Sequence, residues 1–409
     1  MAKVAMIVWN DFRNDARVRK EAETLQAAGH QVTVFALHTP GKTFKRQTLE
    51  SGVKVVRVDR SPFWGLREQM GLLVQPAAAG AGGGPAKAGK GRTALRVATR
   101  GLAHGSWMAR IVASRPDVIH AHDVNTLPTA WLASLLARAP LVYDAHEIST
   151  DREGYGSVRN LVGWVEKKLM PRASATITTT DARAKFFARA YRIPRPLVLQ
   201  NRPRFEQAPR TDRLREELGL RPDWPIILYQ GGIQQGRGLD KLIVAAGDVP
   251  QAHLVFIGGG RLEGELQALV ASRQLGDKVR FIPTVDLDQL LSYTRSADIG
   301  VQPIENTCLN HLTTDSNKLF EYVMAGLPVV TSDLPEIRKI VNAHQFGLLV
   351  PPGDVGALSA ALRRLAADPV LRSNLAANAE HAAASLTWEA QEDSLVDLYS
   401  AIENRSRKP

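Results

Sequence analysis

Short apolar runs alternate with amphipathic segments along most of the chain. In the first half, strand patterns occur at VAMIVW (4–9) and QVTVFAL (31–37), and a helical pattern between them ends near Gly29. Glycine there suits the left-handed residue that commonly stops a helix. Further strand patterns are VKVVRV, DVIHAH, LVYDAH and ATITTT. Strand–helix–strand alternation is typical of a parallel sheet covered by helices.

The second half repeats this alternation. Strand patterns are PIILYQGG, HLVFIGGG, VRFIP, ADIGVQP and PVVTSD, with helical patterns near 238–247, 263–274 and 286–295. Two such runs predict an α/β protein with two Rossmann-like domains. In such sheets ligands bind at the carboxyl ends of the strands, so a site is expected in a crevice there.

The Pro-rich, polar segment 201–210 predicts the domain boundary. We expect one domain over 1–203 and a second over 204–387. The helical pattern near the end of the chain makes residues 388–409 a candidate to pack back on the first domain.

One segment departs from the α/β pattern. Residues 75–92 are rich in Gly and Ala, cannot bury a core and predict a loop. Their flanks within 60–112 combine Trp, Phe, Leu and Arg. These flanks fit basic amphipathic helices resting on a membrane, and they fit ordinary packing helices equally well.

Composition places the chain among globular proteins. Of its 409 residues, 44% are hydrophobic and 23% are charged. The single cysteine, Cys308, excludes an intramolecular disulfide and suits a reducing compartment. The first residues read as a buried strand and not as a signal peptide, and no apolar run is long enough to span a membrane. A cytoplasmic protein is therefore expected.

The net charge of +11 is unevenly distributed. Residues 1–200 hold 30 Lys and Arg against 15 Asp and Glu, whereas residues 201–409 hold 22 against 26. The basic first half suggests an anionic partner, such as a membrane face or a phosphate-bearing substrate, unless it is only a solvated surface. Its basic residues are scattered and not interleaved with aromatics, so nucleic acid is not expected.

The stretch TTDSNKLFEYVMAGLPVVTSD (313–333) carries the first candidate chemistry. On a helical wheel, Asn317, Lys318 and Glu321 share one side, opposite an apolar side. A helix N-terminus and a lysine suit a phosphate, and a carboxylate one turn inward suits a ribose diol. The alternative is an amphipathic helix with an i, i+3 Lys–Glu pair.

Two further patterns follow predicted strands. Glycines including Gly232 follow one strand and lead to Arg237, which suits a diphosphate, although a tight turn with a surface arginine fits too. HAHD (120–123) and DAHE (144–147) end two strands of the first half. Their histidines and acids lack the helical spacing of HExxH, so a metal is not favoured.

Together these motifs resemble the retaining, metal-independent glycosyltransferases of family 4. The resemblance runs nearly end to end through DARVRKEAETLQAAGHQVTV, DVIHAHD, VYDAHE, LQNRPRF, SNKLFEYVMAGLPVVTSDLPEI and TWEAQEDSLVDLY. It implies the GT-B fold of two Rossmann-like domains facing across a cleft. It implies no cofactor.

The resemblance also implies roles for individual residues. His146 matches an active-site histidine near the transferred sugar, Arg237 the basic residue that neutralises the donor diphosphate, and Glu321 the ribose-binding glutamate. The implied donor-binding residues are Asn10, Asp11, Gly232, Arg237, Asn317, Lys318 and Glu321. The implied acceptor-binding residues are His122 and Asp123.

Two positions depart from the family pattern. Thr313 stands where most relatives have a sugar-binding glutamate, with Glu305 and Asp315 nearby. Gly232 stands where relatives have an arginine. The departures concern the sugar and part of the diphosphate clamp.

The expected activity is retaining transfer of a sugar from a nucleoside diphosphate sugar to a saccharide or lipid-linked acceptor. Cell-surface polysaccharide or glycolipid synthesis is the expected setting, with the basic domain drawn to the inner face of an anionic membrane. Two alternatives stay open. One is a nucleotide-sugar 2-epimerase, and the other is a non-catalytic binder of nucleotide sugars or nucleic acid.

Overall fold

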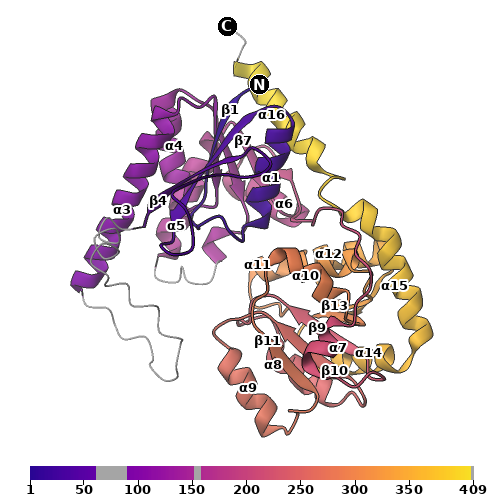
Figure 1. Cartoon of the computed structure of the whole chain (residues 1–409). Helices are drawn as coiled ribbons and strands as arrows, with labels where there is room; N and C mark the ends of the chain where they lie inside the picture. The colour runs from indigo at the N-terminus through magenta and orange to yellow at the C-terminus, as the bar shows by residue number, and fades with distance from the viewer. Residues whose placement is uncertain (61–89, 152–157, 407–409) are drawn as a thin grey trace. The chain divides into compact units, whose positions relative to one another are not determined.

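The computed structural model describes residues 1–60, 90–151 and 158–406 (Figure 1). Two compact α/β units form, each with its own sheet. Unit 1 comprises residues 1–178, 184–197 and 394 onward, and unit 2 comprises 179–183 and 198–393. The segment 61–74 and nearly all of the predicted Gly/Ala-rich loop lie outside the described residues.

Unit 1 is built on an eight-stranded sheet of order β3-β4-β2-β1-β5-β6-β7-β8. Its strands are β1 (Lys3–Ile7), β2 (Gln31–His38), β3 (Arg46–Thr48), β4 (Lys54–Asp59), β5 (Val118–His122), β6 (Leu141–Ala145), β7 (Ala175–Thr178) and β8 (Leu197–Val198). Its helices are α1 (Ala16–Ala27), α3 (Lys90–Ala113), α4 (Leu127–Ala137), α5 (Arg159–Leu169), α6 (Asp181–Tyr191) and α16 (Glu392–Ser406), with 3₁₀ turns at Ser149–Asp151 and Met170–Arg172.

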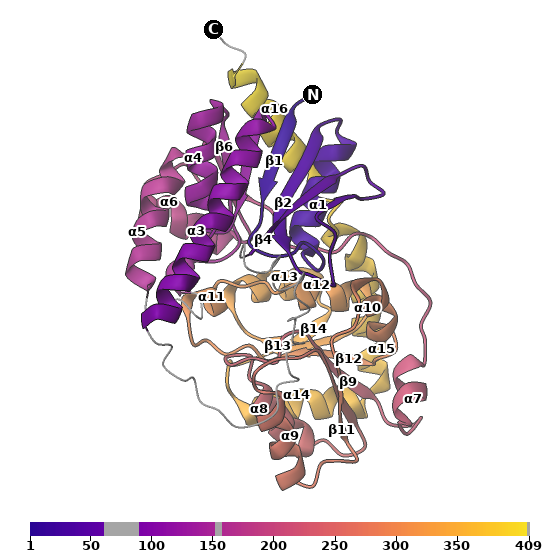
Figure 2. The same ribbon diagram turned by 60° about the vertical axis from the view of Figure 1, so that its left-hand side comes forward.

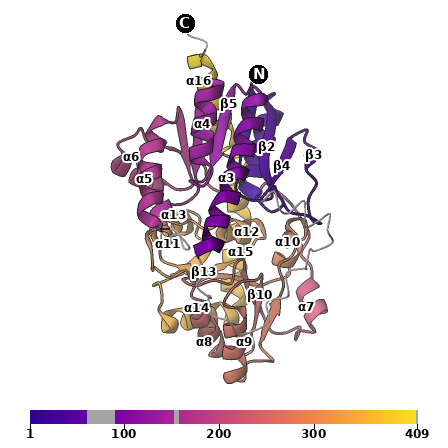
Figure 3. The same ribbon diagram turned by 90° about the vertical axis from the view of Figure 1, so that its left-hand side faces the viewer.

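The central strands of unit 1 are buried on both faces. Every residue of β5 and β6 is buried, as expected for parallel strands between helical layers. Helices α3, α4 and α5 cover one face of the sheet (Figures 2 and 3). Helix α16 lies on the other face with α1, where the Tyr399 ring meets His30 edge to face. Strand β3 runs antiparallel to β4.

Unit 2 has a six-stranded parallel sheet of order β11-β10-β9-β12-β13-β14. Its strands are β9 (Ile226–Gln230), β10 (His253–Ile257), β11 (Val279–Ile282), β12 (Ile299–Gln302), β13 (Val329–Ser332) and β14 (Gly347–Val350). Its helices are α7 (Arg213–Leu218), α8 (Leu239–Gly247), α9 (Glu263–Ser272), α10 (Leu287–Thr294), α11 (Leu309–Leu312), α12 (Asn317–Met324), α13 (Pro335–His344), α14 (Val355–Ala367) and α15 (Pro369–Ala383), with a 3₁₀ turn at Ala384–Leu386.

Helix α12 has the two sides that the wheel predicts. Leu319, Phe320 and Val323 are buried in one core of unit 2. Lys318 and Glu321 are only half-buried on the other side. The apolar side anchors the helix, and this anchoring fixes where its polar side points.

Helix α3 contains part of the segment 60–112, which was expected either to rest on a membrane or to pack on the protein. Trp107 and Ile111 on its inner side are fully buried, and the Trp107 indole donates to the carbonyl of Ala36 at 3.1 Å. The inner side of the described part of α3 therefore packs on the sheet, whereas Leu102 on the same helix is exposed. Among the described residues, no helix combines the length and apolar character needed to cross a membrane.

Candidate active site

The two histidine- and acid-containing motifs of unit 1 end on neighbouring strands. β5 pairs in parallel with β6, and His122 lies opposite Asp144. Asp123 follows β5 directly with a left-handed backbone (φ 63°), and His146 follows β6 directly. Because parallel strands present their carboxyl ends at one edge, HAHD and DAHE meet there.

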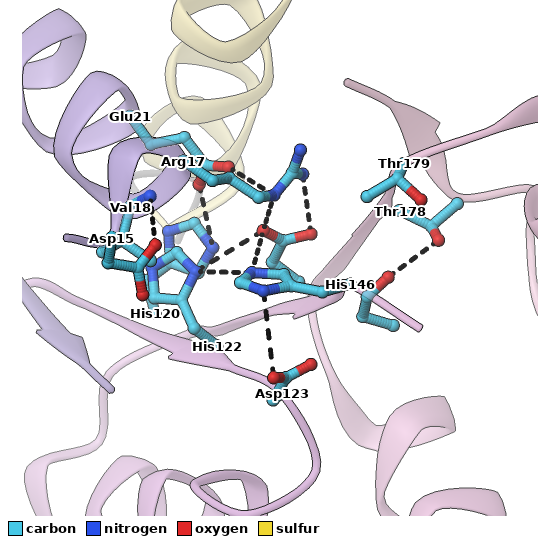
Figure 4. Close-up of polar contacts among 12 residues, drawn as sticks. Asp15, Arg17, Val18, Glu21, His120, His122, Asp123, His146, Thr178 and Thr179 are labelled. Carbon is cyan, nitrogen blue, oxygen red and sulfur yellow. Dashed lines mark hydrogen bonds and ion pairs between the residues drawn. The ribbon is translucent and has the colours of Figure 1, made fainter. Parts of the chain in front are cut away.

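Asp144 is the centre of this cluster, and three residues that contact it, Arg17, His122 and His146, are labelled in Figure 4. Arg17 of α1 donates to both of its oxygens, from Nε at 2.7 Å and from Nη2 at 2.9 Å. His146 Nε2 lies 2.9 Å from Asp144 Oδ2, and His122 Nδ1 lies 3.4 Å from the same oxygen. A bidentate guanidinium fixes the plane of the carboxylate, and the carboxylate in turn orients the His146 ring.

A second layer of buried groups supports Arg17. Glu21, one turn along α1, lies 3.2 Å from Arg17 Nε and 3.8 Å from His120 Nε2. His120 Nδ1 lies 2.9 Å from the hydroxyl of Tyr399 on α16. All these side chains are buried, so α16 closes the cluster on the side away from the strand ends.

Burial and neighbouring charges shift the pKa values of the cluster residues in different directions. Burial would lower the pKa of His146, but Asp123 and Asp144 raise it to about 9. Burial would raise the pKa of Asp144, yet Arg17 and His146 hold it well below its usual range. Burial and the charge of Asp144 raise the pKa of Glu21 well above its usual range. At neutral pH, the raised pKa of His146 favours an imidazolium bound to the Asp144 carboxylate.

The same groups have the chemistry of a metal site. Glu21, His120, His122 and Asp144 offer donor atoms that all lie within 4.8 Å of one another. Carboxylate and imidazole ligands suit a transition metal. However, Arg17 already sits against Asp144 and Glu21, and a metal ion would place a second cation beside its guanidinium. The geometry favours Arg17 as the cation here, and a site without metal stays a prediction.

Asn10 and Asp11 lie in the loop that follows β1. Asn10 donates to Asp15 at 2.6 Å and accepts from the Phe12 amide, and Phe12 itself has a left-handed backbone (φ 58°). Asp11 accepts from Arg13 and from the Thr39 hydroxyl. Both side chains stabilise the loop, and their donor-binding role stays a prediction.

In unit 2, the end of β9 meets the first turn of α12. Gly231 has a φ of 121°, and a Cβ there would lie 2.5 Å from Lys318 Cε. The glycine thus lets the Lys318 side chain lie along the backbone, with its Nζ 5.4 Å from the ring centroid of Tyr229. Gly232, the next residue, is exposed and accepts the Tyr229 hydroxyl at its carbonyl. The structure thus brings Gly232 and Lys318 to the same strand end.

Arg237 and Lys318 form a concentration of positive charge in this unit. Burial and the nearby Arg237 lower the pKa of Lys318 to about 8. Neither side chain forms an ion pair with any described residue. The first N–H groups of α12 also have no side-chain cap from Ser316, which itself has a φ of 57°. This arrangement favours a bound anion.

Glu321 lies one turn inside α12 and is held by unit 2 itself. The side-chain nitrogen of Gln230, the last residue of β9, donates to its Oε2 at 2.5 Å, and the side-chain oxygen of Gln230 accepts from the Thr294 hydroxyl. The i, i+3 ion pair with Lys318 is absent from the described residues. The structure therefore contradicts the simple paired-helix alternative and leaves Glu321 oriented by Gln230. Asn317 is exposed at the start of the helix.

The residues near the missing sugar-binding glutamate are engaged elsewhere. Thr313 is buried, donates to the Leu309 carbonyl and accepts from Arg183 at 3.2 Å. Glu305 is paired with Lys241, and Asp315 accepts from Gln200 at 2.9 Å. Because both acids are bound to other residues, neither takes the place of the glutamate that the family pattern has at Thr313.

Sequence reasoning missed Arg17, Glu21 and Asp144 as site residues. Asp144 lies in the DAHE motif, which the sequence analysis used without assigning a role to this residue. Arg17 and Glu21 lie in the first predicted helix, where no function was assigned to them. A signal existed, because on a wheel from Arg17 at 0° Glu21 falls near 40°, beside the buried Leu25. Charged residues on the apolar side of a helix predict a buried polar cluster.

Comparison with known proteins matches both units. Residues 15–202 match the Glycosyl transferase 4-like domain, and residues 210–382 match the family Glycosyl transferases group 1. The chain belongs to the group 1 glycosyltransferases. This membership confirms the resemblance inferred from the motifs.

Relatives and solved structures agree with this family. A D-inositol 3-phosphate glycosyltransferase of Thermomonospora curvata is 31% identical over 206 residues, which cover 47% of this chain and 46% of that protein. The chain thus spans about half the length of the curated relatives it matches.

Solved structures match nearly the whole chain. Sucrose-phosphate synthase from Thermosynechococcus elongatus is similar with a TM-score of 0.76 and 20% identity, over 99% of this chain and 100% of that one. Anabaena HepE, solved with UDP-glucose, has a TM-score of 0.68 and 17% identity over 98% and 100%. These likenesses confirm the predicted GT-B fold of this group 1 glycosyltransferase.

Proposed function

We propose that this protein transfers a sugar from a nucleoside diphosphate sugar to an acceptor, with retention at the anomeric carbon. One observation carries the proposal. Arg237 and Lys318 bring two positive charges without an ion-pair partner among the described residues to the strand ends of unit 2, beside the N-terminus of α12. A diphosphate supplies the matching negative charges, and it gains charge as the sugar departs.

The surrounding residues fit the rest of a nucleotide. Glu321, oriented by Gln230, is placed to accept the hydrogen bonds of a ribose diol, and Asn317 lies beside the first turn of the same helix. Anabaena HepE was solved with UDP and with UDP-glucose, which makes uridine the first base to test. We assign Gly232 to close approach of the backbone to this ligand.

His146 is proposed to position or polarise the substrate. Because its pKa is raised to about 9, its ring is protonated at neutral pH and cannot act as a nucleophile or a base. This supports attack by the acceptor on the face that the diphosphate leaves, without a covalent intermediate on the protein. Asp123, 3.8 Å from His146 Nδ1, and His122 are the proposed acceptor-side groups.

The proposed acceptor is a saccharide or a lipid-linked saccharide. WaaG, a structural neighbour at 18% identity, is named as a glycosyltransferase of lipopolysaccharide biosynthesis. That name supports a cell-surface polysaccharide or glycolipid as the product. We further propose that the protein works at the cytoplasmic face of a membrane, because its first half is basic.

The decisive experiment is calorimetry and thermal shift of the full chain with UDP, GDP and ADP and their sugars. UDP or a UDP-sugar is expected to bind and to raise the melting temperature. Failure of all the nucleotides to bind would sink the donor site. Conversion of the donor sugar to its C2 epimer without any acceptor would favour the 2-epimerase, and binding without nucleotide release on any acceptor would favour a non-catalytic binder.

A further inference from the structure

Unit 1 carries a surface on which exposed hydrophobic side chains and cations occur together. Twelve large hydrophobic side chains are exposed among the described residues, and seven of them belong to three helices of this unit. They are Leu102 of α3, Leu132, Leu135 and Leu136 of α4, and Val158, Leu161 and Trp164 at the start and middle of α5. Each is between 42% and 63% exposed, so a large part of their apolar area meets solvent.

These three helices form one continuous layer. α4 packs against α3 on one side and against α5 on the other, on the same face of the sheet (Figures 2 and 3). The guanidinium of Arg172, just after α5, lies 5.9 Å from the ring centroid of Trp131 in the middle of α4. We call the outward side of this layer the α3–α5 face, made of the seven side chains above and the cations Arg110, Arg138, Arg159, Lys167, Lys168 and Arg172.

Helix α4 is apolar on both of its sides. Leu127, Ala130 and Ala133 are buried toward the sheet, whereas Leu132, Leu135 and Leu136 point outward. A helix at the surface of a water-exposed protein normally carries polar residues on its outer side. Three outward leucines therefore indicate that this side of α4 contacts an apolar phase or partner.

The charged residues of the α3–α5 face indicate which kind of partner it can bind. Its six cations are all exposed. The only acidic residue in the sequences of α3, α4 and α5 is Glu166, which is buried and accepts from Tyr143 at 2.6 Å and from Ser149 at 2.5 Å. These helices therefore present cations and no exposed carboxylate of their own, although Arg159 lies 3.6 Å from Oδ1 of Asp151, which precedes α5. A second copy of the chain would bring cations against cations, and a nucleic acid would not use the leucines.

We propose that the α3–α5 face docks unit 1 on an anionic lipid bilayer. Trp164 and the leucines enter the interfacial region, while Lys167, Lys168 and the arginines contact lipid phosphates. An anionic bilayer is the partner that matches both the apolar and the cationic side chains. The surface is separate from sugar transfer, so either proposal can fail without the other.

Vesicle flotation of the full chain tests this surface. We expect binding to vesicles that contain phosphatidylglycerol, weaker binding as salt rises, and little binding to phosphatidylcholine alone. The double variant Lys167→Glu/Lys168→Glu should bind anionic vesicles about tenfold more weakly or worse. Leu135→Ser/Leu136→Ser should also lose about tenfold, and lower salt should not restore its binding.

Matched controls lie on unit 2. Leu287 and Val370 are exposed apolar residues, and Arg273 is an exposed cation. The double variant Leu287→Ser/Val370→Ser and the single variant Arg273→Glu should bind vesicles like the wild type. Because every changed side chain is exposed, the melting temperatures should stay close to the wild-type value.

Three outcomes would overturn the proposal. The first is a wild-type chain that does not bind anionic vesicles at low salt. The second is equal binding by the α3–α5 variants and the wild type. The third is a wild-type dimer in sedimentation velocity that Leu135→Ser/Leu136→Ser dissociates, because the face would then be a self-association surface.

Discussion

The two candidate clusters, one in each unit, satisfy their charges in different ways. In unit 1, Asp144 receives Arg17, His146 and His122, so its negative charge is met inside the unit. In unit 2, Arg237 and Lys318 repel each other, and neither has an ion-pair partner among the described residues. Unit 1 has a prebuilt arrangement that fixes a histidine, whereas unit 2 has two like charges that we propose an anionic ligand neutralises.

This difference indicates whether each cluster contributes mainly to folding stability or mainly to ligand binding. A buried, fully paired cluster contributes to folding, and breaking it costs stability. Adjacent like charges cost stability, and a ligand of opposite charge relieves that cost on binding. Changes in unit 1 should therefore appear mainly in the free energy of unfolding, and changes in unit 2 mainly in ligand affinity.

The largest effect is expected from Arg17→Met. Removing the guanidinium leaves the Asp144 carboxylate buried without its bidentate partner, which should cost about 3 to 5 kcal/mol of unfolding free energy. Denaturant unfolding measures this cost. Arg19→Met on the same helix is the control, because Arg19 is 58% exposed and pairs only at the surface with Glu23. It should cost less than about 1 kcal/mol. Equal costs for the two variants would remove the contrast between the units.

The fold of both units was largely predictable from the sequence. Strands β5, β6, β9 and β10 are buried along their whole length and are mostly apolar, because helices cover both of their faces. The short strands β3 and β14 were not predicted. All three residues of β3 are exposed, so it pairs through its backbone and carries no apolar pattern. Hydrophobic periodicity cannot reveal a strand that pairs through its backbone but has no buried apolar side chains.

The site was predictable only where chemistry coincides with a strand or helix end. HAHD, DAHE and the first turn of α12 met that condition. Arg17 did not, because its burial depends on Asp144, which lies 127 positions away in the chain. The engagement of Thr313 by Arg183 is likewise a long-range contact that local periodicity does not encode.

The pH dependence of stability should have opposite signs in the two units. The pKa of His146 is raised from its usual 6.5 to about 9, so its contribution is complete below pH 6.5 and is lost as pH rises to 9. The loss should reach about 2 to 3 kcal/mol in the wild type. Unfolding of wild type and of His146→Gln at both pH values measures it. A variant with the same pH slope as the wild type would show that His146 is not held as an imidazolium.

Lys318 should give the free energy of unfolding a pH dependence of the opposite sign. Its pKa is lowered from 10.5 to about 8, so the unfolded chain binds more protons between these values and stability should rise with pH there. The gain should be roughly 1 kcal/mol, because the side chain is partly exposed. The slope should disappear in Lys318→Met, and its persistence there would assign it to other groups.

Ligand affinity should respond to the same lysine. Lys318→Met removes one of the two cations proposed to hold the diphosphate and should weaken UDP binding by roughly tenfold, or about 1.4 kcal/mol. The free energy of unfolding at neutral pH should stay equal or rise, because a repulsion with Arg237 is relieved. Calorimetry with UDP measures the affinity. Lys339→Met is the control, since Lys339 is 56% exposed and pairs with Glu336. A variant that unfolds far more easily and binds UDP normally would reverse the assignment of the two clusters.

The smallest effect is expected from Glu321→Gln. The substitution keeps the size of the side chain and an oxygen that can accept from Gln230, but removes the charge that would strengthen two hydrogen bonds to the ribose. The Michaelis constant for the donor should rise about fivefold, or about 1 kcal/mol, with little change in kcat. Glu321→Ala removes the acceptor altogether and should raise the same constant further. A fall in kcat at an unchanged Michaelis constant would place Glu321 near the reacting sugar, and the nucleotide end of unit 2 would then need another ribose partner.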